Sequence, residues 1–339
     1  MGIRTSMPFS LPRNKISCAP ARAALISVAS LAFAAHGWAQ PYPSRVIKFL
    51  VAAQPGATPD VVGRLFALPL AEGIGQPVIV ENRPGANGIL GVEAVSRAAP
   101  DGYTLLIAST STLSTNPFLY PKTGMLAVTG LMPVTKLIVS DFVVAARASL
   151  GAATIGDLIS MVRAKPGALN ASTSAPGSSA YLGLELLKQM GKLNFVTVTH
   201  AGGASSAAAL AGGYADFAID TQVMVAPLLK SGKVVLLATT GSERNSRAPE
   251  VPSVSEAGLP GFKLIGWIAL MAPKGTPENI VATVQAHLAQ VARRADIRTK
   301  LSAIEQVPVV NTPEQFAAEL IEERQQWERV IKASGISLE

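Results

Sequence analysis

Apolar and polar positions along the chain follow a pattern that predicts strand, turn and helix, repeated. The apolar, β-branched runs 46–52, 77–82 and 104–109 each fit a buried strand. Segments 61–74 and 89–99 follow the first two runs and fit amphipathic helices. Strands alternating with helices predict a parallel sheet covered on both faces, with the following loops at one shared edge.

The same pattern restarts after residue 150. Its strand-like runs are 169–173, 195–200, 216–220 and 234–240. Two longer extended runs, 133–146 and 264–273, lie between the two units and after the second. The predicted fold class is therefore α/β, with two Rossmann-like lobes joined by a two-strand hinge. The amphipathic last helix, 316–334, is expected to pack on lobe 1.

The first 39 residues are predicted to be a secretory signal peptide. Cations precede an apolar run, 23–35, that is too short for a bilayer, which needs roughly 20 residues. Gly37 and Ala39 supply small residues before a cleavage site at Ala39. Retention as an anchor is the alternative. The predicted division is signal peptide 1–39, lobe 1 at 40–140 plus 265–339, and lobe 2 at 141–264.

Removing this segment changes the charge and cysteine content. It carries four cations and no acid, so 25 Lys and Arg remain against 22 Asp and Glu, and the net charge falls from +7 to +3. The basic character is thus mostly a targeting feature, and no nucleic-acid partner is predicted. Cys18, the one cysteine, lies in the removed segment. The mature chain therefore has no disulfide, zinc–thiolate site or thiol nucleophile.

Motifs for nucleotide binding and catalysis are absent from the sequence. There is no G-x-x-x-x-G-K-S/T loop, no G-x-S-x-G elbow and no H-E-x-x-H helix, and the glycines of 85–91 have the wrong spacing for a dinucleotide site. No cofactor, metal site or catalytic residue is predicted. His200 ends a strand and can face a pocket, either as a hydrogen-bonding group or, with a partner, as a general base.

The turns between strands and helices favour an anion. The first N–H groups of a helix lack partners, and glycine lets a ligand approach them. In 54–60, Thr58 is expected to cap the helix, Pro59 to stand at its first position and Asp60 to offset the dipole or orient a ligand. Loops 109–116 and 172–179 place hydroxyl groups at equivalent helix starts. Ordinary helix capping is the alternative for each loop.

Six stretches carry a family resemblance that spans the mature chain from about Tyr42. They are "YPSRVIKFLVAAQPGATPDVVGRL", "GQPVIVENRPGANGILGVEAVSRAAPDGYTLL", "AKPGALN", "EVPSVSEAGLPGF", "APKGTP" and "TPEQFAA". The sequence resembles the solute receptors of tripartite tricarboxylate transporters, also called Bug receptors. The resemblance implies a type II-like periplasmic binding protein, monomeric, that closes over a small organic carboxylate and delivers it to membrane permease subunits.

The resemblance also implies binding positions, and this chain departs from some of them. The family loop P-G-G-G-T-D is Pro55 to Asp60 here, with two glycines lost and Pro59 in place of an N–H. The family P-Y-K-G is Thr199 to Gly202, without the lysine, and a family histidine is Tyr181. Fewer cations imply a small or neutral-tailed acid. The predicted binding residues are Gln54, Gly56, Ala57, Thr58, Asp60, Ser109, Thr110, Ser174, Gly177, Ser178, Ser179, Thr199, His200, Ala201 and Asp220.

Three functions follow from these observations. The leading hypothesis is a non-enzymatic periplasmic receptor for a small organic carboxylate. The second is a binding protein that presents its ligand to a signalling partner. The third is a secreted hydrolase or lyase on the same scaffold, which needs His200 together with Asp220 or Asp60 as its catalytic groups.

Overall fold

A computed structural model describes residues 1–3, 7–10, 42–245 and 248–339. The apolar run of the predicted signal peptide and the cleavage site at Ala39 lie outside these residues. The chain divides into the units 1–42 and 43–339. The second unit contains the fold described below.

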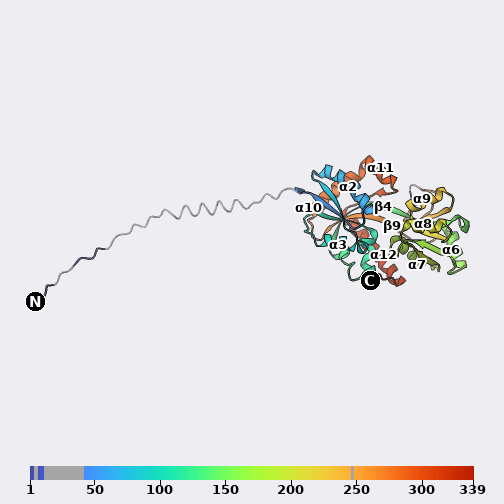
Figure 1. Cartoon of the computed structure of the whole chain (residues 1–339), viewed down its shortest axis with the longest axis horizontal. Helices are drawn as coiled ribbons and strands as arrows, with labels where there is room; N and C mark the ends of the chain where they lie inside the picture. Colours follow the sequence, from blue (N-terminus) through green and yellow to red (C-terminus); the bar gives the residue numbers. More distant parts are fainter. Residues whose placement is uncertain (4–6, 11–41, 246–247) are drawn as a thin grey trace. The chain divides into compact units, whose positions relative to one another are not determined.

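The strands and helices follow the predicted order (Figure 1). The strands are β1 (Ile47–Val51), β2 (Val78–Asn82), β3 (Thr104–Ser109), β4 (Leu131–Arg147), β5 (Asn170–Thr173), β6 (Val196–Thr199), β7 (Phe217–Thr221), β8 (Val234–Thr239), β9 (Ile265–Pro273) and β10 (Val307–Pro308). The α-helices are α2 (Thr58–Ile74), α3 (Ile89–Ser96), α4 (Asn116–Leu119), α5 (Leu126–Thr129), α6 (Ile155–Ala164), α7 (Ser179–Gly191), α8 (Gly203–Ala211), α9 (Gln222–Lys230), α10 (Glu278–Arg293), α11 (Ala295–Ala303) and α12 (Pro313–Ser334). Short 3₁₀ or π segments are η1 (Ala86–Gly88), η2 (Ser111–Thr115) and η3 (Ala148–Leu150).

The described strands form one sheet in the order β2-β1-β3-β9-β4-β7-β5-β6, and β8 and β10 also pair with β4. Pairing is parallel within two groups, β2-β1-β3 and β7-β5-β6. The strands β4, β8, β9 and β10 pair antiparallel. The α/β fold class is confirmed, and the strands of the two units pair in parallel as predicted, except β8, which pairs antiparallel with β4.

Strand β4 lies between the two groups in the sheet order. Its residues 131–141 pair with β9, and its residues 142–147 pair with β7 and β8. The chain passes back from the second group to β9 after β8. There the Thr240 hydroxyl donates to the Phe142 and Leu264 carbonyls, each at 2.8 Å. We propose lobe boundaries at 140/141 and 264/265, and this change of partners supports them.

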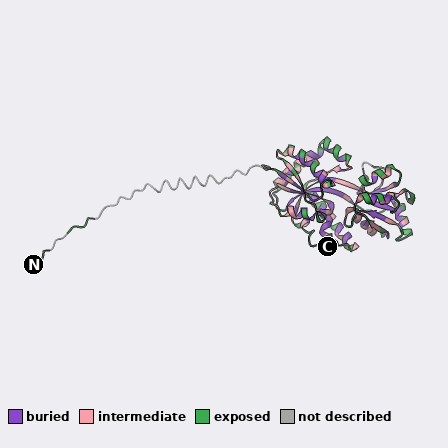
Figure 2. Cartoon of the chain, viewed as in Figure 1, coloured by how far each residue is buried: buried purple, intermediate pink, exposed green. Residues whose placement is uncertain are grey.

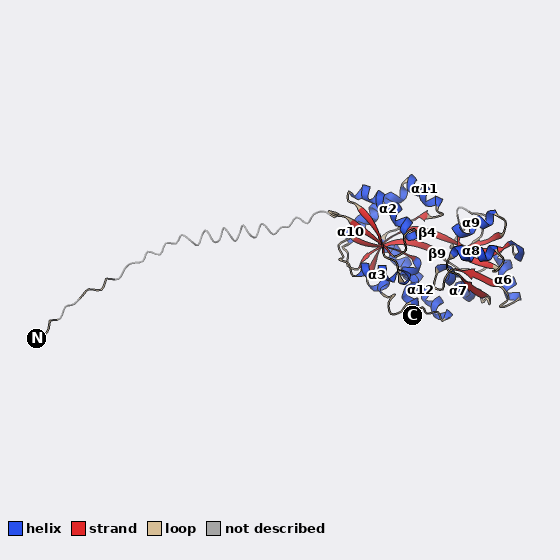
Figure 3. Ribbon diagram, viewed as in Figure 1, coloured by secondary structure: helices blue, strands red, loops and turns tan. Residues whose placement is uncertain are grey.

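Helices cover both faces of each parallel group (Figure 3). In the first group, Gly63 of α2 lets the helix approach closely, since a Cβ there would lie 2.9 Å from Ile107 of β3. In the second group, Gly183 of α7 faces Ile219 and Gly203 of α8 faces Asp220. Adjacent residues of a strand point to opposite faces, so α7 and α8 cover opposite sides of β7.

The last helix spans both groups, so the prediction that it packs on lobe 1 was incomplete. Phe316 and Leu320 of α12 are buried against Trp267 in the first core. Trp327 and Ile331, further along α12, are buried in the core around β5 and β7. Figure 2 shows buried residues along the strands and exposed ones on the outer helix faces.

Candidate functional site

The first predicted loop joins β1 to α2, and its cap differs from the prediction. Ala57, in an extended conformation, is the N-cap, and no side chain caps the helix. Thr58 is therefore the first helical residue rather than the cap, and Pro59 stands second. Because Pro59 has no N–H, the helix start presents fewer backbone donors than another sequence would.

Asp60 is held inside the molecule, where its carboxylate is bonded to neighbouring groups of the same lobe. Its carboxylate accepts hydrogen bonds from the Gly56 N–H at 2.8 Å, Arg64 Nε at 3.0 Å and Asn82 Nδ2 at 2.9 Å. Burial raises the pKa of Asp60, but these bonds and the Arg64 charge outweigh it, so the pKa lies below its ordinary value. Asp60 therefore fixes the turn, and the Gly56 N–H is not free for a ligand.

The rest of this turn is open to solvent. Gln54, Gly56 and Thr58 are exposed. The Ala57 N–H donates to the Gln54 carbonyl at 3.2 Å. Among the described residues, the Thr58 N–H has no hydrogen-bond acceptor. The turn thus offers the Thr58 N–H at the positive end of a 17-residue helix, beside the Thr58 hydroxyl.

The loop after β3 is largely fastened to its own lobe. Thr110 is buried, and its hydroxyl accepts from the Trp267 N–H at 2.8 Å and lies 3.3 Å from the Trp267 carbonyl. A ligand role for the Thr110 hydroxyl is therefore not supported. Ser109 is half-buried and bonds to the hydroxyls of Ser111 and Thr112, at 3.0 and 3.3 Å.

Two asparagines missed by the sequence reading join neighbouring loops. Asn87 Nδ2 donates to Asn116 Oδ1 at 2.7 Å, and Asn116 Nδ2 donates to the Asn87 carbonyl at 2.9 Å. Gly88, at φ +90°, allows this approach because a Cβ there would lie 2.6 Å from the Thr112 hydroxyl. These contacts orient the loops after β2 and β3 relative to each other.

The second predicted loop, 174–179, leads from β5 into α7. Ser178 caps the helix, accepting the Tyr181 N–H at 3.2 Å, and its hydroxyl bonds to Ser174 Oγ at 2.8 Å. Ser179 begins the helix. Gly177 has φ +81°, and a Cβ there would lie 2.7 Å from Leu338 and 3.0 Å from Leu119. The loop is thus fixed by a cap and by the C-terminal segment.

The third predicted set lies at the ends of β6 and β7. Thr199 and Ala201 are exposed, whereas His200 is half-buried. The backbone N–H of His200 donates to the Thr173 carbonyl at 2.9 Å. Asp220 is buried, and one carboxylate oxygen accepts the Thr221 N–H at 2.8 Å. Burial raises the pKa of Asp220 to about 6, against the lowering effect of that bond.

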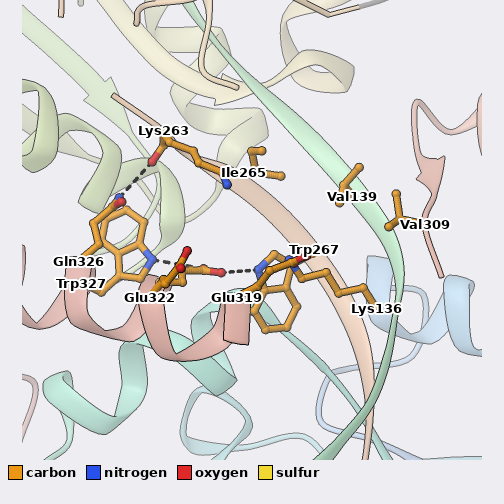
Figure 4. Close-up of a pocket in the computed structure, with 11 residues that line it drawn as sticks. Lys136, Val139, Lys263, Ile265, Trp267, Val309, Glu319, Glu322, Gln326 and Trp327 are labelled. Atoms are coloured by element: carbon orange, nitrogen blue, oxygen red, sulfur yellow. Dashed lines mark hydrogen bonds and ion pairs between the residues drawn. The ribbon is translucent and has the colours of Figure 1, made fainter. Parts of the chain in front are cut away.

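A cavity of about 290 Å³ lies against strands β4 and β9 and helix α12 (Figure 4). None of the predicted binding residues lines it. Its lining is Lys136, Val139, Lys263, Ile265, Trp267, Val309, Glu319, Glu322, Glu323, Gln326 and Trp327. The Glu323 carboxylate in this lining accepts from Trp267 Nε1 at 2.8 Å and from Trp327 Nε1 at 3.3 Å. Burial raises the pKa of Glu323, although these bonds and Lys136 oppose the rise.

Metal and membrane-spanning features are not found in the described ranges. No cluster of three or more His, Cys, Asp or Glu there is arranged to hold a metal ion. No described helix combines the length and apolarity needed to cross a bilayer. The predicted loops instead bring backbone N–H groups, hydroxyls and two buried acids to strand ends. Two α/β groups sharing a long strand, with such loops at the strand ends, define the class of periplasmic binding proteins.

Comparisons identify the family within this class. The model of the family described as "Tripartite tricarboxylate transporter family receptor" matches residues 62–336. Protein BugT of Bordetella pertussis is 32% identical over 314 residues, 92% of this chain and 96% of that protein. The chain belongs to this receptor family, as the motifs predicted.

Two solved structures with bound carboxylates are similar over nearly their whole length. R. palustris Rpa4515 with adipate is 31% identical with a TM-score of 0.73, covering 87% of this chain and 99% of that one. MatC (Rpa3494) from Rhodopseudomonas palustris with bound malate is 32% identical with a TM-score of 0.68, covering 86% of this chain and 100% of that one. A further TctC solute binding protein, from Polaromonas, at 24% identity and TM-score 0.78, supports the fold.

Proposed function

We propose that the chain is a periplasmic receptor that captures a small organic carboxylate between its two lobes and delivers it to membrane permease subunits. The receptor acts as a monomer without chemistry on its ligand, and reaches the periplasm through its signal peptide. The observation that carries the proposal is the Thr58 N–H, unpartnered among the described residues and exposed at the start of α2.

The surroundings of Thr58 suit an anion. The helix dipole places partial positive charge at this end of α2, where a carboxylate gains electrostatic and hydrogen-bond energy. The Thr58 hydroxyl and the Gln54 amide add side-chain donors on the same exposed turn. Asp60 turns its charge inward onto Arg64 and Asn82, which keeps a like charge from opposing the ligand.

We propose that the second half of the binding surface is loop 174–179 with residues 199–201. Closure is then a movement of the lobes at the crossing strands, where β4 changes partners between Asp141 and Phe142. A ligand that contacts both lobes binds the closed form better than the open form, and so shifts the population toward it.

The two other hypotheses gain no specific support. Presentation to a signalling partner uses the same fold and surface, and no observation favours it over transport. A hydrolase needs a base held by an orienting group. In the described residues, the buried Nε2 of His200 and one carboxylate oxygen of Asp220 have no hydrogen-bond partner, so they do not form such a pair.

A thermal-shift screen of residues 40–339 tests the proposal. The protein is stripped of ligand by unfolding and refolding, then mixed with mono-, di- and tricarboxylates, aromatic acids, acidic amino acids and neutral amides. We expect at least one carboxylate to raise the melting temperature, with a stabilisation of about 2.7 kcal/mol at a hundredfold excess over its dissociation constant. No neutral amide should match it.

A pair of variants at one position tests the carrying observation. Thr58→Pro removes the N–H while keeping a residue that the first helical position accepts, and Thr58→Ala removes only the hydroxyl. We expect Thr58→Pro to abolish the carboxylate shift and Thr58→Ala to weaken it. Stabilisation by neutral compounds alone, or an unchanged shift in Thr58→Pro, would show that this turn does not bind a carboxylate.

A further inference from the structure

Three buried polar atoms around the first turn of α8 have no hydrogen-bond partner among the described residues. They are His200 Nε2, Ser206 Oγ and Asp220 Oδ2. Ser206 and Asp220 are more than nine-tenths buried, at 0% and 4% exposure. An unsatisfied buried polar group is costly and uncommon in native proteins, so each of these atoms is expected to bond to a water molecule or to a ligand group.

The three atoms lie at one end of the second lobe. His200 directly follows β6, and its backbone N–H donates to the carbonyl of Thr173 at the end of β5. The Asp220 carboxylate lies against the start of α8, since a Cβ on Gly203 would come within 2.9 Å of Oδ1 and 3.2 Å of Oδ2. Ser206 is in the same first turn of α8, and its carbonyl accepts the Ser172 hydroxyl at 3.2 Å. This is the same edge that carries the proposed loops.

The chemistry of these atoms restricts the partner. Asp220 Oδ2 is an acceptor, and no described cation forms an ion pair with it. Ser206 Oγ both donates and accepts, and His200 Nε2 does one or the other according to its tautomer. A second carboxylate would meet the like charge of Asp220. A hydroxyl or an ammonium group instead donates to Asp220. Its remaining hydrogen-bond donor or acceptor positions can pair with Ser206 and His200.

We propose that this edge binds a hydrogen-bond-donating substituent of the cargo, so that the receptor selects a hydroxy or amino carboxylic acid over the unsubstituted acid. The inference rests on the proposed function and narrows its ligand class. Gly203 is part of the arrangement, because a Cβ there would lie too close to the Asp220 carboxylate and displace it.

Matched acids test the selection. Dissociation constants at pH 8 are measured by calorimetry for succinate, malate and aspartate, and for adipate, 2-hydroxyadipate and 2-aminoadipate. Within the series that binds, we expect the hydroxy or amino acid to bind at least about tenfold more tightly than its parent, as a hydrogen bond to a charged group implies. Comparing the hydroxy acid with the amino acid of each series shows whether the cargo carries a hydroxyl or an ammonium group.

Variants test which residues give the preference for the substituted acid. Asp220→Asn should reduce the preference to less than about threefold, most strongly for an amino acid, because the charge is lost. Asp216→Asn is the control, since Asp216 is also buried and precedes the other end of β7, where it pairs with Arg147. It should leave the preference unchanged. Ser206→Ala removes a hydroxyl that has no partner among the described residues, so it should fold, and should weaken the preference.

The outcomes separate this inference from the proposed function. If no carboxylate in the screen binds, the proposed function is wrong and the inference is wrong with it. If the best acid carries no donor and binds as tightly as its substituted counterpart, only the inference is overturned. An unchanged preference in both Asp220→Asn and Ser206→Ala overturns it as well.

Discussion

Replacing Asp60 with alanine is expected to lower the free energy of unfolding by about 3 kcal/mol and to abolish the carboxylate shift. The substitution leaves the Gly56 N–H and the Asn82 amide without their acceptor and removes the partner of Arg64. Losing a buried charged acceptor costs a few kcal/mol. Because the turn at Gln54 to Thr58 is held by this carboxylate, its donors should lose their alignment. Urea unfolding and the thermal-shift assay measure the two effects.

A matched control separates this network from ordinary helix capping. Asp157 occupies the same third position of α6 and accepts the Ala153 and Thr154 N–H groups, but it is exposed. Asp157→Ala should therefore cost less stability and leave the carboxylate shift intact. If Asp60→Ala is no more destabilising than Asp157→Ala, the buried network does not hold the turn.

The same carboxylate predicts a pH effect. The pKa of Asp60 is lower in the folded chain than in the unfolded chain, so its contribution to stability is present above the unfolded pKa of about 4. That contribution is lost as the pH falls through the folded value. The stability difference between wild type and Asp60→Ala should shrink in this acid range, and a difference that grows on acidification would contradict the assignment.

Replacing Trp327 with alanine is expected to lower the free energy of unfolding by about 3–5 kcal/mol, the usual cost of removing a large core aromatic. Trp327 is 1% exposed and brings the C-terminal half of α12 into the core around β5 and β7. Trp327→Phe is the matched control. It keeps an aromatic ring and loses the N–H that donates to Glu323, so about 1 kcal/mol should be lost.

The position of Trp327 also predicts how the chain unfolds. Phe316 anchors the other end of α12 in the first core, so the helix ties the two parallel groups together. Chemical unfolding followed by tryptophan fluorescence and by circular dichroism should give coincident transitions in wild type and separated ones in Trp327→Ala. A loss below about 1 kcal/mol with coincident transitions would show that α12 does not couple the groups.

The strands could be predicted from sequence because each is a short apolar run bounded by polar turns. The run 46–52 became β1 at Ile47–Val51, and the run 264–273 became β9 at Ile265–Pro273. The directions of the strands relative to one another could not be predicted as well from the sequence. Whether β4 runs parallel or antiparallel to β9 depends on pairing between residues more than 100 positions apart, as for Ile138 and Ile268.

The binding loops could be located from the turn chemistry, but the roles of individual side chains could not. Thr110 is a hydroxyl in a polar loop by sequence, and only the fold places it on the Trp267 backbone, 157 residues away. Asn82 ends β2 and reaches Asp60 because β1 and β2 are neighbours. Nothing in the local sequence of either residue records its partner.

The central claim is that a carboxylate binds between the start of α2 and the loop before α7. A crystal structure of residues 40–339 with the acid that gives the largest thermal shift tests it most directly. We expect the carboxylate within hydrogen-bond distance of the Thr58 N–H, with loop 174–179 closed against the same ligand. Density for the acid in the cavity between Trp267 and Trp327, with the turn at Thr58 empty, would contradict the account.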